Sequence, residues 1–373
     1  MKNSKQKKIV HIIAGLRGGG RERRMLELVR SLDSQNNFIQ YIILLDNKID
    51  YPVVYTTNAK IVIVDYKSKW KTIKELIKTF CMIKPTILHV WTEIHYVLCL
   101  ISLLKPLVGY KLIIGFLADG NPIKNSLCRF SYKLSYWFAD YIVSNSKAGL
   151  VAKEAITEKS KVIYNGFTFS RFEKFKIYNK ELIKKELGVD STIVVSMMAR
   201  FNSAKDWDTF LKIAEQVQQQ NVDVVFLAVG QGELLKHYRS MADEMNLQNV
   251  IFTGFRDDID KLLFVSDICL LCTNEKVHAE GVSNSIMEAM AAEKPIIATL
   301  GGGTAEIISN AIDGYIIPPS DYMMGAKTLL RLVHNEVERK VISISAKKKI
   351  EVDFSLEKMV SEYVEMYNQL LKK

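Results

Sequence analysis

The chain has 373 residues and is basic overall, with 51 lysines and arginines against 41 aspartates and glutamates. This length exceeds what one hydrophobic core usually serves, so two domains are expected. An apolar fraction of 48% with 25% charged residues argues against a disordered or fibrous chain. Five cysteines at irregular spacing argue against a disulfide framework, and no apolar run reaches the roughly 18 residues of a membrane span. Because the N-terminus has no signal-peptide pattern, we expect a cytoplasmic protein.

Positive charge is concentrated in the first half of the chain. Residues 1–187 hold 32 lysines and arginines against 15 acidic residues, whereas the remainder holds 19 against 26. This asymmetry indicates a basic half that meets an anionic ligand or surface. Nucleic acid is not favoured as that partner, since no DNA- or RNA-binding motif accompanies the charge.

Residues 1–168 predict one α/β domain. Apolar strands are expected at 8–16, 41–45, 61–64, 86–90, 111–116 and 141–146, with helical patterns between them, such as 21–32 and 69–81. Strands of almost continuous apolar character that alternate with helices are typical of a parallel sheet covered on both faces.

A second α/β domain is predicted at residues 189–350, after a lysine-rich linker at 169–188. Its expected strands are 192–200, 223–230, 249–255, 267–273, 295–299 and 314–319. The tail, 351–373, predicts a helix that returns to the first domain. Both domains have the element order of a doubly wound, Rossmann-like fold, whose ligands bind beyond the carboxyl ends of the strands. Two such domains facing each other would form a central cleft.

Cations and glycines stand at the carboxyl ends of the strands in the second domain. Arg200 ends the first of these strands, and Lys205 follows in the next loop, a pair that suits a diphosphate. The glycines at the other strand ends, where backbone must turn sharply or approach something closely, are Gly230, Gly232, Gly302 and Gly303.

The stretch Ser283-Asn284-Ser285 predicts the start of a helix, with Glu280 before it and Glu288 inside it. Small polar residues at a helix start expose backbone N–H groups to an anion such as phosphate. The two carboxylates would repel that phosphate, so they suit neutral hydroxyls on either side of it, as in a nucleotide-sugar. Ser285-x-x-Glu288 is also the pattern of a capping box, in which Glu288 only closes the helix start. The residues alone leave both interpretations open.

As a set, EGVSNSIMEAMA, GQGE, TGFRDD and GGGTAE, together with Arg200 and Lys205, resemble the nucleotide-sugar domain of glycosyltransferase family 4, a retaining family of GT-B fold. The segment GLRGGGRERRMLELV resembles the glycine-rich first loop of the same family, so the resemblance spans nearly the whole chain. It implies that Arg200 and Lys205 neutralise the donor diphosphate, that Glu288 holds the ribose, and that Glu280 contacts the transferred sugar.

The resemblance also implies roles at the edges of the site. Residues near Arg256 would contact the base, and Gly19 and Gly20 would let the first loop approach the phosphates. Many family members carry a histidine in the first domain, against the sugar or acceptor. Here the corresponding loop offers Asp119, which is alternatively a turn residue, and His95 is a substitute from the neighbouring strand end.

The expected function is therefore retaining transfer of a sugar from a UDP- or GDP-linked donor to a glycan acceptor in bacterial surface polysaccharide synthesis. Such transfer needs no cofactor, and no metal site is expected. The alternatives are a nucleotide-sugar epimerase or hydrolase of the same fold, and a non-catalytic protein that binds nucleotide-sugars.

Two lysine-rich segments with aromatic residues, 67–84 and 125–138, suggest contact with an anionic membrane surface. A glycan acceptor carried on a lipid in the inner leaflet would make a peripheral association useful. The alternative is that the apolar sides of these segments simply pack on the sheet.

Two further motifs do not indicate functional sites. Cys269-x-x-Cys272 lies within an apolar strand with no second cysteine pair, which favours core residues over a redox or metal site. Gly18-x-Gly20-x-x-Arg23 follows a strand but lacks the third glycine of a dinucleotide fingerprint.

Overall fold

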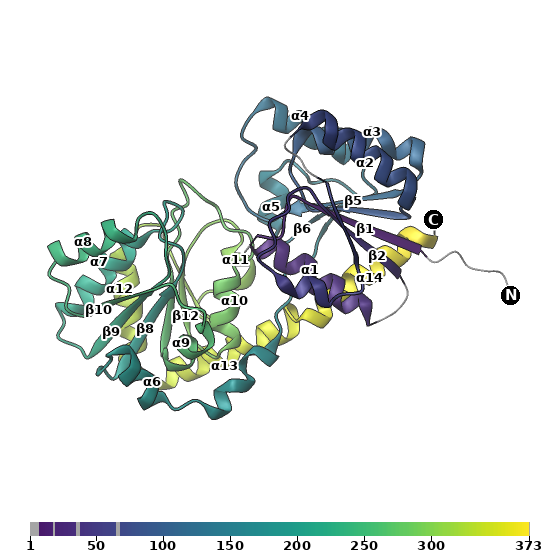
Figure 1. Cartoon of the computed structure of the whole chain (residues 1–373). Helices are drawn as coiled ribbons and strands as arrows, with labels where there is room; N and C mark the ends of the chain where they lie inside the picture. Colours follow the sequence, from purple (N-terminus) through teal and green to yellow (C-terminus); the bar gives the residue numbers. More distant parts are fainter. Residues whose placement is uncertain (1–6, 18, 35–37, 65–67, 373) are drawn as a thin grey trace. The chain divides into compact units, whose positions relative to one another are not determined.

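The computed structural model describes residues 7–17, 19–34, 38–64 and 68–372. The chain divides into two compact units, Met1–Gly166 with Leu356–Lys373, and Phe167–Ser355. Figure 1 shows the first unit mainly in purple and blue with the yellow C-terminal helix, and the second mainly in teal and green. Gly18 of the glycine-rich loop lies outside the described residues.

The first unit is built on a seven-stranded parallel sheet with the order β3-β2-β1-β4-β5-β6-β7. Its strands are β1 (Lys7–Ile13), β2 (Phe38–Leu44), β3 (Lys60–Ile63), β4 (Ile87–Val90), β5 (Lys111–Leu117), β6 (Tyr141–Ser144) and β7 (Ser160–Val162). The central strands are buried along almost their whole length because helices cover both faces.

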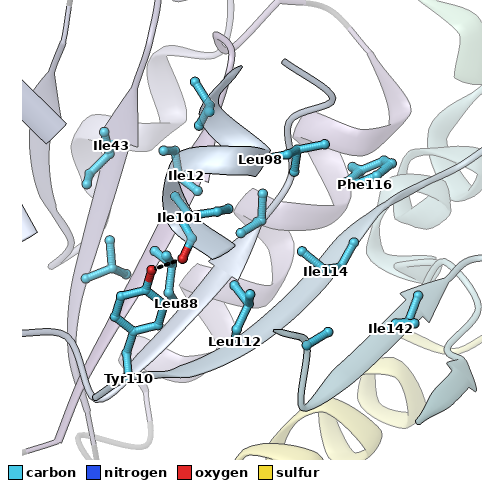
Figure 2. Packing of buried hydrophobic residues seen from close by; sticks show 14 of the residues in the cluster. Ile12, Ile43, Leu88, Leu98, Ile101, Tyr110, Leu112, Ile114, Phe116 and Ile142 are labelled. Atoms are coloured by element: carbon cyan, nitrogen blue, oxygen red, sulfur yellow. Dashed lines mark hydrogen bonds between the residues drawn. The ribbon is translucent and has the colours of Figure 1, made fainter. Parts of the chain in front are cut away.

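One face of this sheet is covered by α2 (Lys69–Ile83), α3 (His95–Val108) and α4 (Ser126–Phe138). Ile101 of α3 and Tyr132 of α4 pack with strand residues such as Ile12 and Ile114 in one apolar cluster, part of which Figure 2 shows. The hydroxyl of Tyr110 donates a hydrogen bond to the Ile101 carbonyl within this cluster. The inner sides of all three helices therefore pack against the sheet.

The opposite face is covered by α1 (Gly20–Asp33) and the C-terminal helix α14 (Leu356–Lys372). A cluster of buried polar side chains lies beneath α14. The Arg24 guanidinium, in a side chain only 2% exposed, donates to the Gly115 carbonyl at 2.8 Å, and His89 Nδ1 lies 2.7 Å from the Tyr367 hydroxyl. Burial lowers the pKa of the neighbouring His11 to about 4, although a hydrogen bond with Gln40 opposes the shift.

The second unit has a six-stranded parallel sheet with the order β10-β9-β8-β11-β12-β13. Its strands are β8 (Ile193–Met198), β9 (Val224–Val229), β10 (Val250–Gly254), β11 (Ile268–Leu271), β12 (Ile296–Thr299) and β13 (Tyr315–Ile317). Its longer helices are α7 (Trp207–Gln218), α8 (Leu235–Glu244), α10 (Asn284–Ala291), α12 (Tyr322–His334) and α13 (Glu336–Asp353). In both sheets the strand order reverses at the first strand, which places switch points between β1 and β4 and between β8 and β11.

The segment 169–188, expected as a linker, is folded and belongs to the second unit. It consists of a 3₁₀ helix (Phe169–Ile177) and α6 (Lys180–Leu187). The Phe175 ring meets the Phe264 ring edge-on at 5.3 Å, and the Tyr178 hydroxyl donates to Asp260 at 2.5 Å. These contacts fix the segment against α9 (Ile259–Val265).

Candidate functional site

The switch point of the second sheet brings together Lys205 and Glu280. Lys205 lies in the loop after β8, and Glu280 lies in the segment between β11 and α10. The Lys205 ammonium forms an ion pair with the Glu280 carboxylate, and the two side chains are 15% and 18% exposed. A β-bridge between Lys205 and Thr273 ties the two loops together. Ligands of doubly wound sheets bind at this position, so the structure places the predicted cation and carboxylate where such a ligand would lie.

Arg200 stands at the start of the same loop and is exposed. Its backbone carbonyl accepts a hydrogen bond from the Trp207 indole at 3.1 Å. The Phe201 ring stacks on Trp207 at 3.9 Å, and both of these side chains are fully buried. The aromatic stack therefore anchors the backbone directly after Arg200 and two residues after Lys205.

The glycines after β9 pack against that same loop. Gly230 has φ 143°, and a Cβ there would lie 2.0 Å from the Ala199 carbonyl oxygen. A Cβ at Gly232 would lie 2.2 Å from the carbonyl oxygen of Phe201. Since Cβ atoms do not approach oxygens so closely, a side chain at either position would displace the loop that carries Arg200 and Lys205.

The glycines after β12 determine the position of Glu280 in a similar way. Gly302 has φ 49°, and a Cβ there would lie 1.8 Å from the Glu280 carbonyl oxygen. The Gly303 backbone N–H donates to that same oxygen at 2.8 Å. The predicted close approach of these glycines is thus an approach to backbone carbonyls of neighbouring loops.

Helix α10 begins at Asn284, and its N-cap is Ser283, whose side chain makes no capping hydrogen bond. Ser283 is buried. The Ser285 hydroxyl points instead to the Met198 carbonyl at the end of β8, 3.3 Å away. Because Ser285 is not the N-cap, the capping-box interpretation of Glu288 is not realised.

Glu288 instead accepts a hydrogen bond from Arg171 at 2.6 Å. The Glu288 side chain is 15% exposed and that of Arg171 34%. Arg171 was missed by the sequence interpretation, because it lies in the segment taken for a linker. A carboxylate that pairs with an arginine through one oxygen has further lone pairs, which can accept hydrogen bonds from hydroxyl groups.

Arg256 lies in the turn after β10 and pairs with Asp258 at 2.7 Å and with Glu186 at 3.1 Å. The hydrogen bond with Asp258 raises the pKa of Arg256. The sequence interpretation took Asp-x-Asp, the pattern of metal-dependent transferases, to be absent, but Asp206-x-Asp208 and Asp258-x-Asp260 both have it. The carboxylates of Asp258 and Asp260 bond to Arg256 and Tyr178. No cluster of three metal-ligating side chains occurs within the described ranges of the chain.

The two cysteines of the Cys-x-x-Cys motif are both buried free thiols. Burial raises the pKa of Cys269 to about 11, and it also raises that of Cys272. Both therefore remain protonated at neutral pH, as expected for core residues rather than for a redox or metal site.

The switch point of the first sheet carries a second cation–carboxylate pair that the sequence interpretation missed. Gly19 is the N-cap of α1 and Gly20 its first residue. The next residue, Arg21, forms an ion pair with Glu93, which follows β4. The Tyr132 hydroxyl donates to the other Glu93 oxygen at 2.9 Å. Single charges 72 positions apart give no sequence signal for such a pairing.

Asp119 and His95 both have local structural partners. Asp119 Oδ1 accepts from the Asn121 backbone N–H at 2.9 Å, as in the turn interpretation. The same oxygen lies 3.0 Å from the ammonium of buried Lys153. His95 begins α3, and its Nδ1 lies 3.2 Å from the Ser131 hydroxyl of α4.

Residues 179–349 match the family model described as glycosyl transferases group 1. This part of the chain therefore resembles a glycosyl transferases group 1 domain. It contains Arg200, Lys205, Glu280 and Glu288, whereas Arg171 precedes it. The predicted enzyme class, a glycosyltransferase, is confirmed at the level of this domain, and family 4 within that class stays a prediction.

Two curated relatives extend the similarity beyond the group 1 domain. The chain is 24% identical over 296 residues to N-acetyl-alpha-D-glucosaminyl L-malate synthase of Bacillus anthracis, a match that covers 77% of this chain and 75% of the relative. It is 25% identical over 288 residues to N,N'-diacetylbacillosaminyl-diphospho-undecaprenol alpha-1,3-N-acetylgalactosaminyltransferase of Campylobacter jejuni, covering 76% of this chain and 73% of the relative.

Among solved structures, the chain is similar to HepE of Anabaena, crystallised in complex with UDP and glucose. The TM-score is 0.83 at 18% identity, with 97% of this chain and 99% of HepE covered. This similarity confirms the predicted fold, the GT-B architecture with two Rossmann-like domains.

Proposed function

We propose that the protein is a retaining glycosyltransferase that moves a sugar from a UDP- or GDP-linked donor to a glycan acceptor. The observation that carries the proposal is the Lys205–Glu280 pair at the β8/β11 switch point of a group 1 domain. A diphosphate and a sugar hydroxyl are the ligands that suit such a cation and carboxylate side by side. The UDP and glucose in the HepE complex favour UDP over GDP.

In the proposed reaction, Arg200 and Lys205 offset the charge that develops on the leaving diphosphate. The backbone N–H groups at the start of α10 add to this stabilisation. Glu288 holds the ribose hydroxyls, and Glu280 accepts a hydrogen bond from the transferred sugar. The bond between the anomeric carbon and the diphosphate oxygen breaks, and the acceptor oxygen bonds to the same face of that carbon. Because the acceptor attacks the face that the diphosphate leaves, the anomeric configuration is retained, and the acceptor proton passes to the leaving diphosphate.

In this reaction, side chains of the protein rather than a metal ion neutralise the diphosphate. Transfer is therefore expected to continue in the presence of EDTA. A complete loss of transfer that Mg²⁺ or Mn²⁺ restores would contradict this part of the proposal.

The acceptor is proposed to be a growing bacterial surface polysaccharide carried on a lipid. The Campylobacter relative is named for a diphospho-undecaprenol acceptor, which supports a lipid-linked substrate. Across the helices that the structure describes, none has the length and apolar character of a membrane span. Because a lipid-linked acceptor would be met at a membrane surface, we propose a cytoplasmic protein that acts at the inner face of the cell membrane.

The direct test is incubation with a panel of UDP- and GDP-sugars and a lipid-linked glycan acceptor, followed by NMR of the product. An α-linked donor should give an α-linked product, and an inverted product would overturn retention. Free sugar formed without acceptor would indicate a hydrolase, and an epimerised donor would indicate an epimerase. Donor binding without turnover would indicate a non-catalytic binding protein. Lys205→Ala provides the loss-of-function control.

A further inference from the structure

The outer surface of α2, α3 and α4 exposes large apolar side chains. The residues concerned are Trp70, Met82, Leu107, Leu127, Phe130 and Trp137, and we call this surface the α2–α4 face. Trp70 is 81% exposed and Trp137 80%. The three helices lie together on one side of the first sheet (Figure 1), and their inner sides already pack on that sheet, as Figure 2 shows for Leu98 and Ile101 of α3. The exposed apolar residues are thus distinct from those that pack these helices on the sheet.

The helices on the other side of the same sheet provide an internal comparison. Along α1 and α14, all of which the structure describes, no large apolar residue is exposed. Both sets of helices bury comparable apolar clusters against one sheet. The exposed apolar surface is therefore specific to the α2–α4 face. Large exposed apolar patches on soluble domains mark interaction sites.

The charges on this face are almost entirely positive. Helix α2 exposes Lys71, Lys74 and Lys78 against a single acidic residue, Glu75. On α4, Arg129 and Lys133 are both exposed. Glu154 lies 2.8 Å from Arg129 and 3.5 Å from Lys133, so it offsets part of their charge. Lysines interleaved with exposed tryptophan, phenylalanine and leucine are the composition of surfaces that lie in an anionic lipid interface.

A hollow of about 770 Å³ adjoins Trp137, and its lining holds three lysines, Lys105, Lys111 and Lys159, together with the carboxylates of Asp140 and Glu158. It lies at the amino-terminal edge of the sheet, beside the starts of β5 and β6. Lys111 and Lys159 line it, and Lys159 donates to the Trp137 carbonyl at 3.1 Å. A phosphate-bearing headgroup would find cations beside an aromatic ring there.

We propose that the α2–α4 face docks on an anionic lipid bilayer, with Trp70 and Trp137 at the level of the headgroups. The inference rests on the proposed function and deepens it, because a lipid-linked acceptor would be presented at the membrane surface. The apolar residues supply the insertion, and the lysines supply attraction to anionic lipids. Neutral bilayers should therefore bind weakly, and added salt should weaken binding to anionic ones.

The tryptophans make the test specific. The chain has four tryptophans, and the other two, Trp91 and Trp207, are fully buried. Fluorescence changes on adding vesicles to the full-length protein therefore report on the α2–α4 face. Phosphatidylcholine vesicles containing phosphatidylglycerol should shift the emission to shorter wavelength and co-sediment the protein, whereas phosphatidylcholine alone should do neither.

The variants separate apolar insertion from charge. Trp70→Ser with Trp137→Ser should weaken vesicle binding by about tenfold or more, and Lys71→Glu with Lys74→Glu should remove the preference for anionic vesicles. The control variant is Tyr55→Ser. Tyr55 is 66% exposed, and its neighbour Val54 packs in the cluster on the opposite face of the sheet. The Tyr55→Ser variant should bind vesicles as wild type does. Circular dichroism confirms that each variant folds.

Three results would overturn the inference. They are equal binding to neutral and anionic vesicles, no binding to either, and a wild-type dimer that the two tryptophan substitutions dissociate. The last would make the face a protein–protein interface. UDP affinity, measured by calorimetry on the same variants, should not change. Loss of UDP binding in wild type would instead count against the proposed function, so the two failures are distinguishable.

Discussion

Lys205 and Glu280 form an ion pair across the switch point of the second sheet, with both side chains mostly buried. The strands that precede them, β8 and β11, are hydrogen-bonded neighbours in the sheet. An anionic donor at this point would compete with Glu280 for the lysine. The pair is therefore the feature on which the proposed donor site depends.

Removing either cation of the β8 loop should impair transfer. Lys205→Ala and Arg200→Ala should each lower kcat/KM by roughly 10²–10³, the typical cost of losing one preorganised group that stabilises developing charge. The exposed Lys327 of α12 provides a matched control, since Lys327→Ala should leave transfer unchanged. Near wild-type rates in both loop variants would refute the diphosphate assignment.

Glu280→Gln should distinguish recognition of the transferred sugar from recognition of the nucleotide. The substitution removes a carboxylate that competes for Lys205, so UDP affinity should be unchanged or slightly higher. Turnover should fall, because glutamine accepts a weaker hydrogen bond from the sugar than an ionised carboxylate does. Calorimetry with UDP and steady-state kinetics with the full donor give the two quantities. An equal loss of affinity for UDP and for the full donor would contradict the assigned role.

Glu288 can be tested through its partner Arg171, 2.6 Å away. If Glu288 holds the ribose, Glu288→Gln should weaken UDP binding by about 1–3 kcal/mol. Arg171→Met breaks the same ion pair but leaves a carboxylate at position 288, so it should lower the melting temperature with a smaller effect on UDP affinity. Identical effects of both substitutions on UDP binding would return Glu288 to a structural role.

Much of this arrangement follows from the sequence because the strands are buried on both faces and read as apolar runs. Lys205 and Glu280 could be predicted as neighbours, since each follows a strand and the carboxyl ends of parallel strands share one edge. The position of Arg171 could not be predicted, because its segment has the composition of a linker. Only the tertiary contact between the Phe175 and Phe264 rings shows that the segment is folded. Strand β7 has only three residues, too few for a periodic pattern.

The cluster of buried polar side chains beneath α14 was equally hidden from the sequence. Arg24 lies on a helix with several charged residues and gave no sign that it would be 2% exposed. Arg21 and Glu93 are single charges whose pairing depends on the strand order. Such features arise from tertiary contacts, which hydrophobic periodicity does not report.

The stability of the protein should depend on pH through His11. Burial lowers its pKa from 6.5 to about 4 in the folded state. Between these values the unfolded chain binds a proton that the folded chain does not, so the free energy of unfolding should fall as the pH is lowered through this range. It should be unaffected by His11 above pH 6.5. The loss is on the order of 3 kcal/mol at most.

His11→Gln provides the check, because glutamine can still accept the hydrogen bond that the Trp91 indole donates to His11 at 3.2 Å. Urea unfolding at a series of pH values should show a smaller slope for this variant. Some slope should remain, since burial also lowers the pKa of His89. The exposed His237 supplies the control, and a wild-type slope in His11→Gln would rule out the assignment.

Calorimetric titration can show whether Lys205 binds the diphosphate of a nucleotide-sugar. Wild type and Lys205→Ala would each be titrated with UDP, GDP and the free nucleosides. Wild type should bind UDP or GDP far more tightly than the corresponding nucleoside. Lys205→Ala should lose about tenfold or more in affinity for the diphosphate and almost nothing for the nucleoside. Equal affinities of wild type and variant for UDP and for GDP would contradict binding of the diphosphate by Lys205.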